Sequence, residues 1–141
     1  MIEIRLQIPA LADYIDIVRV CLFGIASKLS FSYEDIEDMK VAVSEACNNA
    51  VLHGSSTSQL QNIDICFESS DNSLTIKVSN KGASFQHEDA VEDASPLPET
   101  DVSELPVGGL GIFLMQALMD DVTVETIDNT TQVTLVKFLT V

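Results

Sequence analysis

The stretch SEACNNAVLHG, residues 44–54, places polar side chains inside an otherwise apolar helical pattern. Asparagine is a mediocre helix former, and an amide that is buried without a hydrogen-bond partner costs free energy. The sequence therefore raises the question of why Glu45, Asn48, Asn49 and His53 stand among alanine, cysteine, valine and leucine.

A helical wheel separates this segment into two faces. The face expected to pack in the core consists of Ile36, Met39, Val43, Ala46, Cys47 and Ala50. The adjacent stripe, which stacks along one edge of the helix, consists of Asp38, Ala42, Glu45, Asn49 and His53. Glu45 and Asn49, one turn apart, offer a carboxylate and an amide oxygen to one place, which suits Mg²⁺. By itself this spacing is more typical of a solvent-facing edge, and Asn48 lies outside both faces.

The segments on either side of this helix follow clear periodicities. Ile2, Ile4, Leu6 and Ile8 alternate with polar residues, which predicts a strand with one buried face that ends at Pro9. Helical spacing follows over about residues 10–29, and Ser32 is a good N-cap for the second helix, which runs to about residue 53.

The C-terminal half of the chain predicts two strand pairs separated by an irregular stretch. Residues 62–69 and 73–80 alternate around a turn at residues 71–72, which predicts a hairpin. Residues 86–107 have no periodicity, which is typical of a lid or an insert. A glycine-rich turn then opens a helix, and two closing strands follow. We therefore expect one domain, residues 1–141, with an α+β two-layer sandwich fold.

Composition excludes several classes of protein. The net charge of −15 makes direct binding to nucleic acid or to an anionic membrane unfavourable. The chain has no apolar run long enough for a membrane span and no signal peptide, so we expect a cytoplasmic protein. The three cysteines, Cys21, Cys47 and Cys66, lack the spacing of a zinc site, and we expect buried free thiols.

The turn VGGLGIF, residues 107–113, opens the third helix with glycines. Glycines at a helix N-terminus let backbone N–H groups approach an anion, and the helix dipole favours phosphate there. A Walker loop is absent, and so is a strand-GxGxxG-helix unit at the start of the chain, which disfavours P-loop and dinucleotide-binding folds.

With these motifs in this order, the chain resembles the GHKL (Bergerat-fold) ATPases, and within them the anti-sigma-factor serine kinases of the RsbW and SpoIIAB type. IEDMKVAVSEACNNAVLH resembles their N box, and GGLGIFLMQALMDDVTV resembles their second glycine box. VSNKGASF occupies the place of the first glycine box. The resemblance covers nearly the whole chain and implies a mixed, mostly antiparallel sheet with helices on one face.

The resemblance also implies roles for individual residues. Glu45 would be the general base, and Asn49 would hold the Mg²⁺ that bridges the phosphates of ATP. Gly82 would pack beneath adenine, and residues 83–107 would form the ATP lid. The residues that would bind the phosphates through the turn are Gly108, Gly109, Leu110 and Gly111. Arg19 would contact protein partners.

This sequence departs from the family pattern at three places. The motif HAY that usually follows the N box is His53-Gly54-Ser55 here. An aspartate that accepts a hydrogen bond from the adenine amino group is replaced by Asn80, which keeps an acceptor oxygen and adds an NH₂ donor. Residues 86–136 contain no lysine or arginine, so no cation of this stretch could clamp the γ-phosphate.

The resemblance implies a cytoplasmic, homodimeric serine-protein kinase and anti-sigma factor. It would use Mg²⁺ and ATP to phosphorylate a serine of a STAS-domain anti-anti-sigma factor, and it would sequester a sigma factor of the sigma-B type. One alternative is a module of the same fold that binds a sigma factor or a STAS partner without turning over ATP. Another is a kinase-like regulator of a different sigma factor or of a phosphatase switch.

Overall fold

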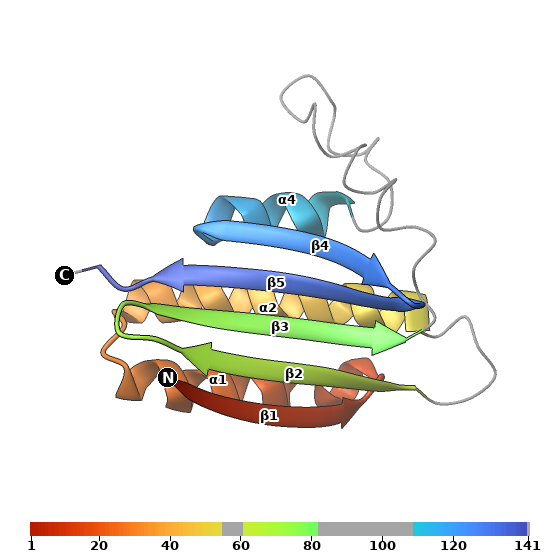
Figure 1. Cartoon of the computed structure of the whole chain (residues 1–141), viewed down its shortest axis with the longest axis horizontal. Coiled ribbons are helices and arrows are strands. Elements are labelled where there is room, and N and C mark those ends of the chain that lie inside the picture. Colours follow the sequence, from red (N-terminus) through yellow and green to blue (C-terminus); the bar gives the residue numbers. More distant parts are fainter. Residues whose placement is uncertain (55–60, 82–108, 141) are drawn as a thin grey trace, which may run out of the picture.

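A computed structural model describes residues 1–54, 61–81 and 109–140 as a single sheet with helices behind it (Figure 1). The strands are β1 (Ile2–Pro9), β2 (Asn62–Ser69), β3 (Ser73–Lys81), β4 (Asp121–Ile127) and β5 (Thr130–Phe138). The helices are α1 (Ile15–Lys28), α2 (Tyr33–Gly54) and α4 (Gly109–Leu118), with a 3₁₀ turn η1 (Ala12–Tyr14) before α1. The expected α+β two-layer architecture is confirmed.

The five strands have the order β1-β2-β3-β5-β4. All four pairings are antiparallel, and the β2–β3 and β4–β5 hairpins form as the sequence predicts. The β3–β5 pairing, from Ser73 opposite Phe138 to Lys81 opposite Thr130, joins the two halves of the chain.

The core lies between the sheet and α2, which runs behind its centre (Figure 1). Every residue of the predicted apolar face of α2 is buried. Opposite it, the sheet contributes Ile63, Ile65, Phe67, Leu74, Ile76, Val78, Val133 and Leu135. The 3.6-residue period of α2 and the two-residue period of the strands thus meet in one hydrophobic layer.

The two N-terminal helices begin differently from each other. The Ser32 hydroxyl accepts a hydrogen bond from the Asp35 N–H at 3.1 Å, which confirms the predicted cap of α2. The first helix was expected from about residue 10, but α1 begins at Ile15. The Ala10 N–H instead donates to the Gln61 carbonyl at 2.8 Å, and this bond continues the β1–β2 pairing past Pro9.

Two expectations about burial are wrong in part. Ile8 is buried, but Ile2 and Ile4, on the same face of β1, are 63% and 39% exposed. The alternation identified the face of the strand correctly, whereas the helices cover only one end of it. Of the three cysteines, which are all free, Cys47 is buried while Cys21 and Cys66 are partly exposed.

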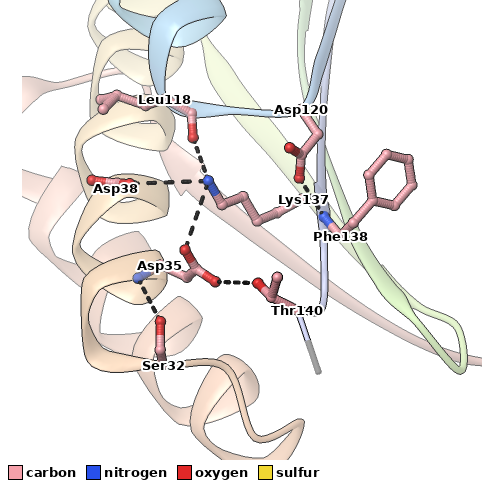
Figure 2. A network of polar contacts seen from close by, with 8 residues as sticks. All are labelled: Ser32, Asp35, Asp38, Leu118, Asp120, Lys137, Phe138 and Thr140. Carbon is pink, nitrogen blue, oxygen red and sulfur yellow. Dashed lines mark hydrogen bonds and ion pairs between the residues drawn. The ribbon is translucent and has the colours of Figure 1, made fainter.

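Lys137, near the end of β5, contacts both α2 and α4 (Figure 2). Its ammonium group donates to the Leu118 carbonyl at 2.6 Å, and it lies 3.9 Å from the carboxylates of Asp35 and Asp38. The side chain is only 11% exposed. The end of α4 and the start of α2 are therefore held to the same strand.

None of the helices in the described residues is long and apolar enough to cross a membrane.

Candidate functional site

The stripe that carries Glu45 and Asn49 faces the first turn of α4. A β-carbon placed on Gly111 would lie 2.9 Å from Glu45 Oε2 and 3.7 Å from both Oδ1 and Nδ2 of Asn49. A separation of 2.9 Å is closer than van der Waals contact allows, so only glycine fits at position 111 without displacing the carboxylate. The structure thus brings Glu45 and Asn49 of α2 together with Gly111 of α4.

Packing on either side explains why these groups meet. α4 buries Ile112, Met115 and Met119 against the rest of the protein. On α2, Ala42 is fully buried one turn before Glu45, and its small side chain leaves the carboxylate room beside α4. Leu110 in the first turn of α4 is half exposed, and Asn48 of α2 is exposed, away from this contact.

The start of α4 has the chemistry of an anion site. The first turn carries no acidic side chain, and its N–H groups have no partner within the helix. Gly109 and Gly111 lie in this turn beside Glu45 and Asn49. Gly82, Gly108 and the expected lid at residues 83–107 lie outside the described residues.

Asn80 lies at the end of β3 and contacts the C-terminal part of α2. Its side chain is 6% exposed, and its Nδ2 donates a hydrogen bond to the Ala50 carbonyl at 3.4 Å. Ala50 directly follows Asn49, so Asn80 contacts the turn of α2 that carries Asn49. Because Nδ2 points to this carbonyl, Oδ1 is the atom left to accept a hydrogen bond from elsewhere.

Thr131 is a buried polar residue that the sequence analysis missed. It stands directly opposite Asn80 in the β3–β5 pairing and is 8% exposed. The signal was present, because Thr131 has the same parity as the core residues Val133 and Leu135. Two polar side chains therefore occupy adjacent core-facing positions at the same end of the sheet.

Arg19 lies on α1 and contacts α2. Its Nη1 donates to the Ser44 hydroxyl at 2.9 Å, and that hydroxyl donates to the Lys40 carbonyl at 2.7 Å. The two basic residues border a shallow groove of about 390 Å³ that is also lined by Asp16, Val20 and Phe23. Val20 and Phe23 are exposed apolar residues, so the groove combines two basic side chains and one acid with uncovered hydrophobic surface. Lys40 is also paired with Glu37 at 3.0 Å.

Cys47 takes no part in the polar site, although it lies two residues from Glu45. Burial raises the pKa of its thiol to about 12, against a smaller opposite effect of the Arg19 charge. The thiol therefore stays protonated at neutral pH and packs as an apolar group.

Comparisons with known proteins identify relatives over most of the chain. Residues 8–137 match the model of the histidine kinase-like ATPase domain. The serine-protein kinase RsbW of Bacillus licheniformis is 43% identical over 137 residues, which are 96% of this chain and 85% of that protein. The proteins of the same name from Bacillus subtilis and Staphylococcus epidermidis are 38% identical over 137 residues and 42% identical over 123. The Bacillus subtilis alignment covers 96% of this chain and 85% of that protein. The Staphylococcus epidermidis alignment covers 86% of this chain and 77% of that protein.

Solved structures share the fold at lower identity. The RsbU and RsbW domains of Rv1364c from Mycobacterium tuberculosis superpose with a TM-score of 0.71 at 19% identity, covering 99% of this chain and 33% of that one. The SiaB-SiaC complex from Pseudomonas aeruginosa gives a TM-score of 0.64 at 11% identity, covering 94% of this chain and 88% of the matched chain.

Proposed function

This chain belongs to the RsbW family of serine-protein kinases, which have a histidine kinase-like ATPase domain, and from that premise we propose its reaction and its partners. It transfers the γ-phosphate of Mg²⁺-ATP to a serine of a STAS-domain anti-anti-sigma factor. When that antagonist is absent, it binds and sequesters a sigma factor of the sigma-B type in the cytoplasm.

The observation that carries this proposal is the meeting of Glu45, Asn49 and Gly111 at the α2–α4 contact. Phosphoryl transfer depends mainly on positioning and on neutralising charge. Glu45 accepts the proton of the attacking serine hydroxyl, whose oxygen then bonds to the γ-phosphorus as the bond to the ADP oxygen breaks.

The donor atoms beside Gly111 fit a hard cation. An amide oxygen and a carboxylate are ligands that Mg²⁺ accepts, and Mg²⁺ keeps phosphate oxygens and waters in its remaining positions. We assign the metal contact to Asn49, and the ion would supply charge neutralisation at the phosphates. Glu45 is then left to serve as the base.

Backbone groups at the start of α4 bind the phosphates in this proposal. The N–H groups of Gly109, Leu110 and Gly111 have no partner within the helix, and the helix dipole favours a negative charge beside them. We extend this role to Gly108, and we propose that Gly82 packs beneath the base while residues 83–107 close over the nucleotide.

Asn80 and Thr131 form the polar end of the base site in this proposal. Asn80 Oδ1 accepts a hydrogen bond from the 6-amino group of adenine, as the aspartate of the family would. The Asn80–Ala50 hydrogen bond supports this assignment, because it holds the amide nitrogen away from the ligand.

The groove beside Arg19 is the proposed docking surface for the sigma factor and for the STAS-domain antagonist. Arg19 and Lys40 are two of only seven basic residues in a chain with 22 acidic ones. Together with Val20 and Phe23 they suit a partner surface that is apolar and acidic. The functional unit is a homodimer.

One observation favours a second candidate function, partner binding without phosphate transfer. Asn80 stands where the family resemblance implies an aspartate, so this chain could be non-catalytic or bind ATP weakly and act only by binding a sigma factor or a STAS partner.

Label transfer from γ-labelled ATP to a candidate STAS protein tests the proposal. We expect Glu45→Ala and Asn49→Ala to abolish labelling, whereas Asn48→Ala, an exposed neighbour on the same helix, keeps it. Tight binding of Mg²⁺-ATP without transfer to any candidate STAS protein would favour the binding module. Absence of ATP binding would overturn the kinase assignment for this chain.

A further inference from the structure

Arg19 is held in place by a hydroxyl and not by a carboxylate. Its Nη1 donates to the Ser44 hydroxyl at 2.9 Å, across the contact between α1 and α2. In the described part of the chain its guanidinium forms no ion pair, although Asp16 lines the same groove. A shortage of acids is not the reason, since the chain has 22 acidic residues. The described residues therefore leave the charge of Arg19 to a partner.

The Ser44 hydroxyl is fixed as the acceptor of this hydrogen bond. It donates its single proton to the Lys40 carbonyl, one turn earlier in α2, at 2.7 Å. A hydroxyl has one donor and two lone pairs, so only its lone pairs are left for Arg19. Both hydrogen bonds are partly buried. The backbone of α2 thus sets the direction of the lone pair that holds the guanidinium.

The bond to Ser44 uses one of the five N–H groups of the guanidinium. Because the guanidinium is planar, fixing one nitrogen restricts the directions of the other N–H groups. Arg19 lines the groove together with the exposed Val20 and Phe23. An arginine that is already held loses less side-chain freedom when it binds a partner. The bond therefore prepares Arg19 for a planar contact with a carboxylate, which guanidinium groups commonly bind through two hydrogen bonds.

Ser44 directly precedes Glu45 but contacts a different neighbour. The Ser44 hydroxyl meets Arg19 of α1, whereas the Glu45 carboxylate faces Gly111 of α4. Successive side chains of an α-helix point about 100° apart, so the two residues serve different contacts of α2. A change at Ser44 should therefore affect the groove and leave the proposed phosphate site in place.

We propose that Ser44 is a positioning residue for docking. It holds the guanidinium of Arg19 in the orientation in which that group receives a carboxylate of the protein partner. This inference rests on the docking surface proposed above and adds the residue that prepares it.

Nuclear magnetic resonance of the full chain without a partner tests the positioning. Arg5 and Arg19 are its only arginines, so the spectrum of arginine Nε–H groups holds two signals, and Arg5 serves as the internal reference. We expect Ser44→Ala to lower the order parameter of Arg19 Nε and to leave that of Arg5 unchanged. Ser44→Thr keeps the hydroxyl and should keep the wild-type value. Equal order parameters of Arg19 in wild type and Ser44→Ala would overturn the proposal.

Steady-state phosphate transfer tests the consequence for docking, with the STAS-domain protein that wild type labels as the probe. Ser44→Ala should raise the KM for this protein about three- to tenfold, the range for ordering one long side chain on binding. The kcat and the KM for ATP should not change. In an Arg19→Ala background Ser44→Ala should have no further effect, because Ser44 acts through Arg19.

Ser27→Ala, which removes an exposed hydroxyl of α1, is the matched control and should keep the wild-type constants. Alanine is a better helix former than serine, so Ser44→Ala should fold, and circular dichroism checks this. An unchanged KM for the STAS-domain protein, or a further rise in the double variant, would overturn the docking role of Ser44.

Failure of this inference can be distinguished from failure of the proposed function. If wild type transfers phosphate to no STAS-domain protein, the proposed reaction fails, and the order parameters still decide whether Ser44 fixes Arg19. If transfer occurs with the same KM in wild type and Ser44→Ala, the kinase reaction stands and the positioning role fails.

Discussion

The side-chain nitrogen of Asn80 is bound to the backbone carbonyl of Ala50, 3.4 Å away and buried. An aspartate at this position could not make that bond, because an ionised carboxylate has no donor. An aspartate, which the family resemblance implies at this position, would therefore leave the Ala50 carbonyl without this donor.

We predict that Asn80→Asp weakens ATP binding about tenfold at pH 8, although it restores the family residue. A buried carboxylate beside a carbonyl is destabilised by about 1 to 3 kcal/mol. Burial also raises the pKa of the introduced acid, so affinity recovers towards pH 5.5, where the protonated acid donates to Ala50. Calorimetric titration with ATP at both pH values checks this. The control Ser79→Asp, on the opposite face of β3, is expected to keep the wild-type affinity for ATP. Tighter ATP binding by Asn80→Asp than by wild type at both pH values would contradict the prediction.

Gly111→Ala is expected to reduce phosphate transfer at least tenfold without unfolding the protein. The added methyl group would lie 2.9 Å from Glu45 Oε2 and must displace the carboxylate. Rates of label transfer and thermal unfolding are measured together.

Gly24→Ala in α1 is the matched control, since its β-carbon would meet nothing within 4 Å. It should leave transfer unchanged and stabilise the helix by about 0.5 to 1 kcal/mol. A wild-type rate of phosphate transfer by Gly111→Ala would contradict the prediction, because it would show that transfer does not depend on the present position of the Glu45 carboxylate.

Lys137→Met is expected to lower the free energy of unfolding by about 1.5 to 3 kcal/mol, the range for hydrogen bonds to charged groups. The variant leaves the Leu118 carbonyl without this donor and removes the ammonium between Asp35 and Asp38 (Figure 2). Urea unfolding followed by circular dichroism gives the value. Lys28→Met, at the exposed end of α1, changes it by less than about 0.5 kcal/mol. Equal effects of the two substitutions would show that the buried contacts of Lys137 are not what stabilises the protein.

The thiols should differ in their reaction with iodoacetamide. At pH 8, Cys47 stays unmodified in the folded protein, because it is buried and its pKa is raised to about 12. Cys21 and Cys66 are partly exposed and react slowly, since raised pKa values lower their thiolate fraction. Alkylation followed by peptide mass spectrometry distinguishes the three. In urea all three react, and early labelling of Cys47 without denaturant would contradict the assigned burial.

Periodicity predicted α2 and its pairing of Glu45 with Asn49, because both depend only on residue spacing along one helix. The close approach of Gly111 could not be predicted, since it depends on where α4 crosses α2. Alternation likewise identified the inner face of β1 but not how far the helices extend over it, which is why the exposure of Ile2 and Ile4 was missed.

The stretch between β3 and α4, residues 82–108, begins and ends at positions that other contacts already hold. Lys81 is paired with Thr130, and α4 packs on α2. The entropic cost of closing a chain segment between two fixed ends grows only logarithmically, by about 0.6 kcal/mol for each doubling of its length. A change in the length of this stretch should therefore have little effect on folding stability. The segment proposed to cover the nucleotide is thus the segment whose length folding constrains least.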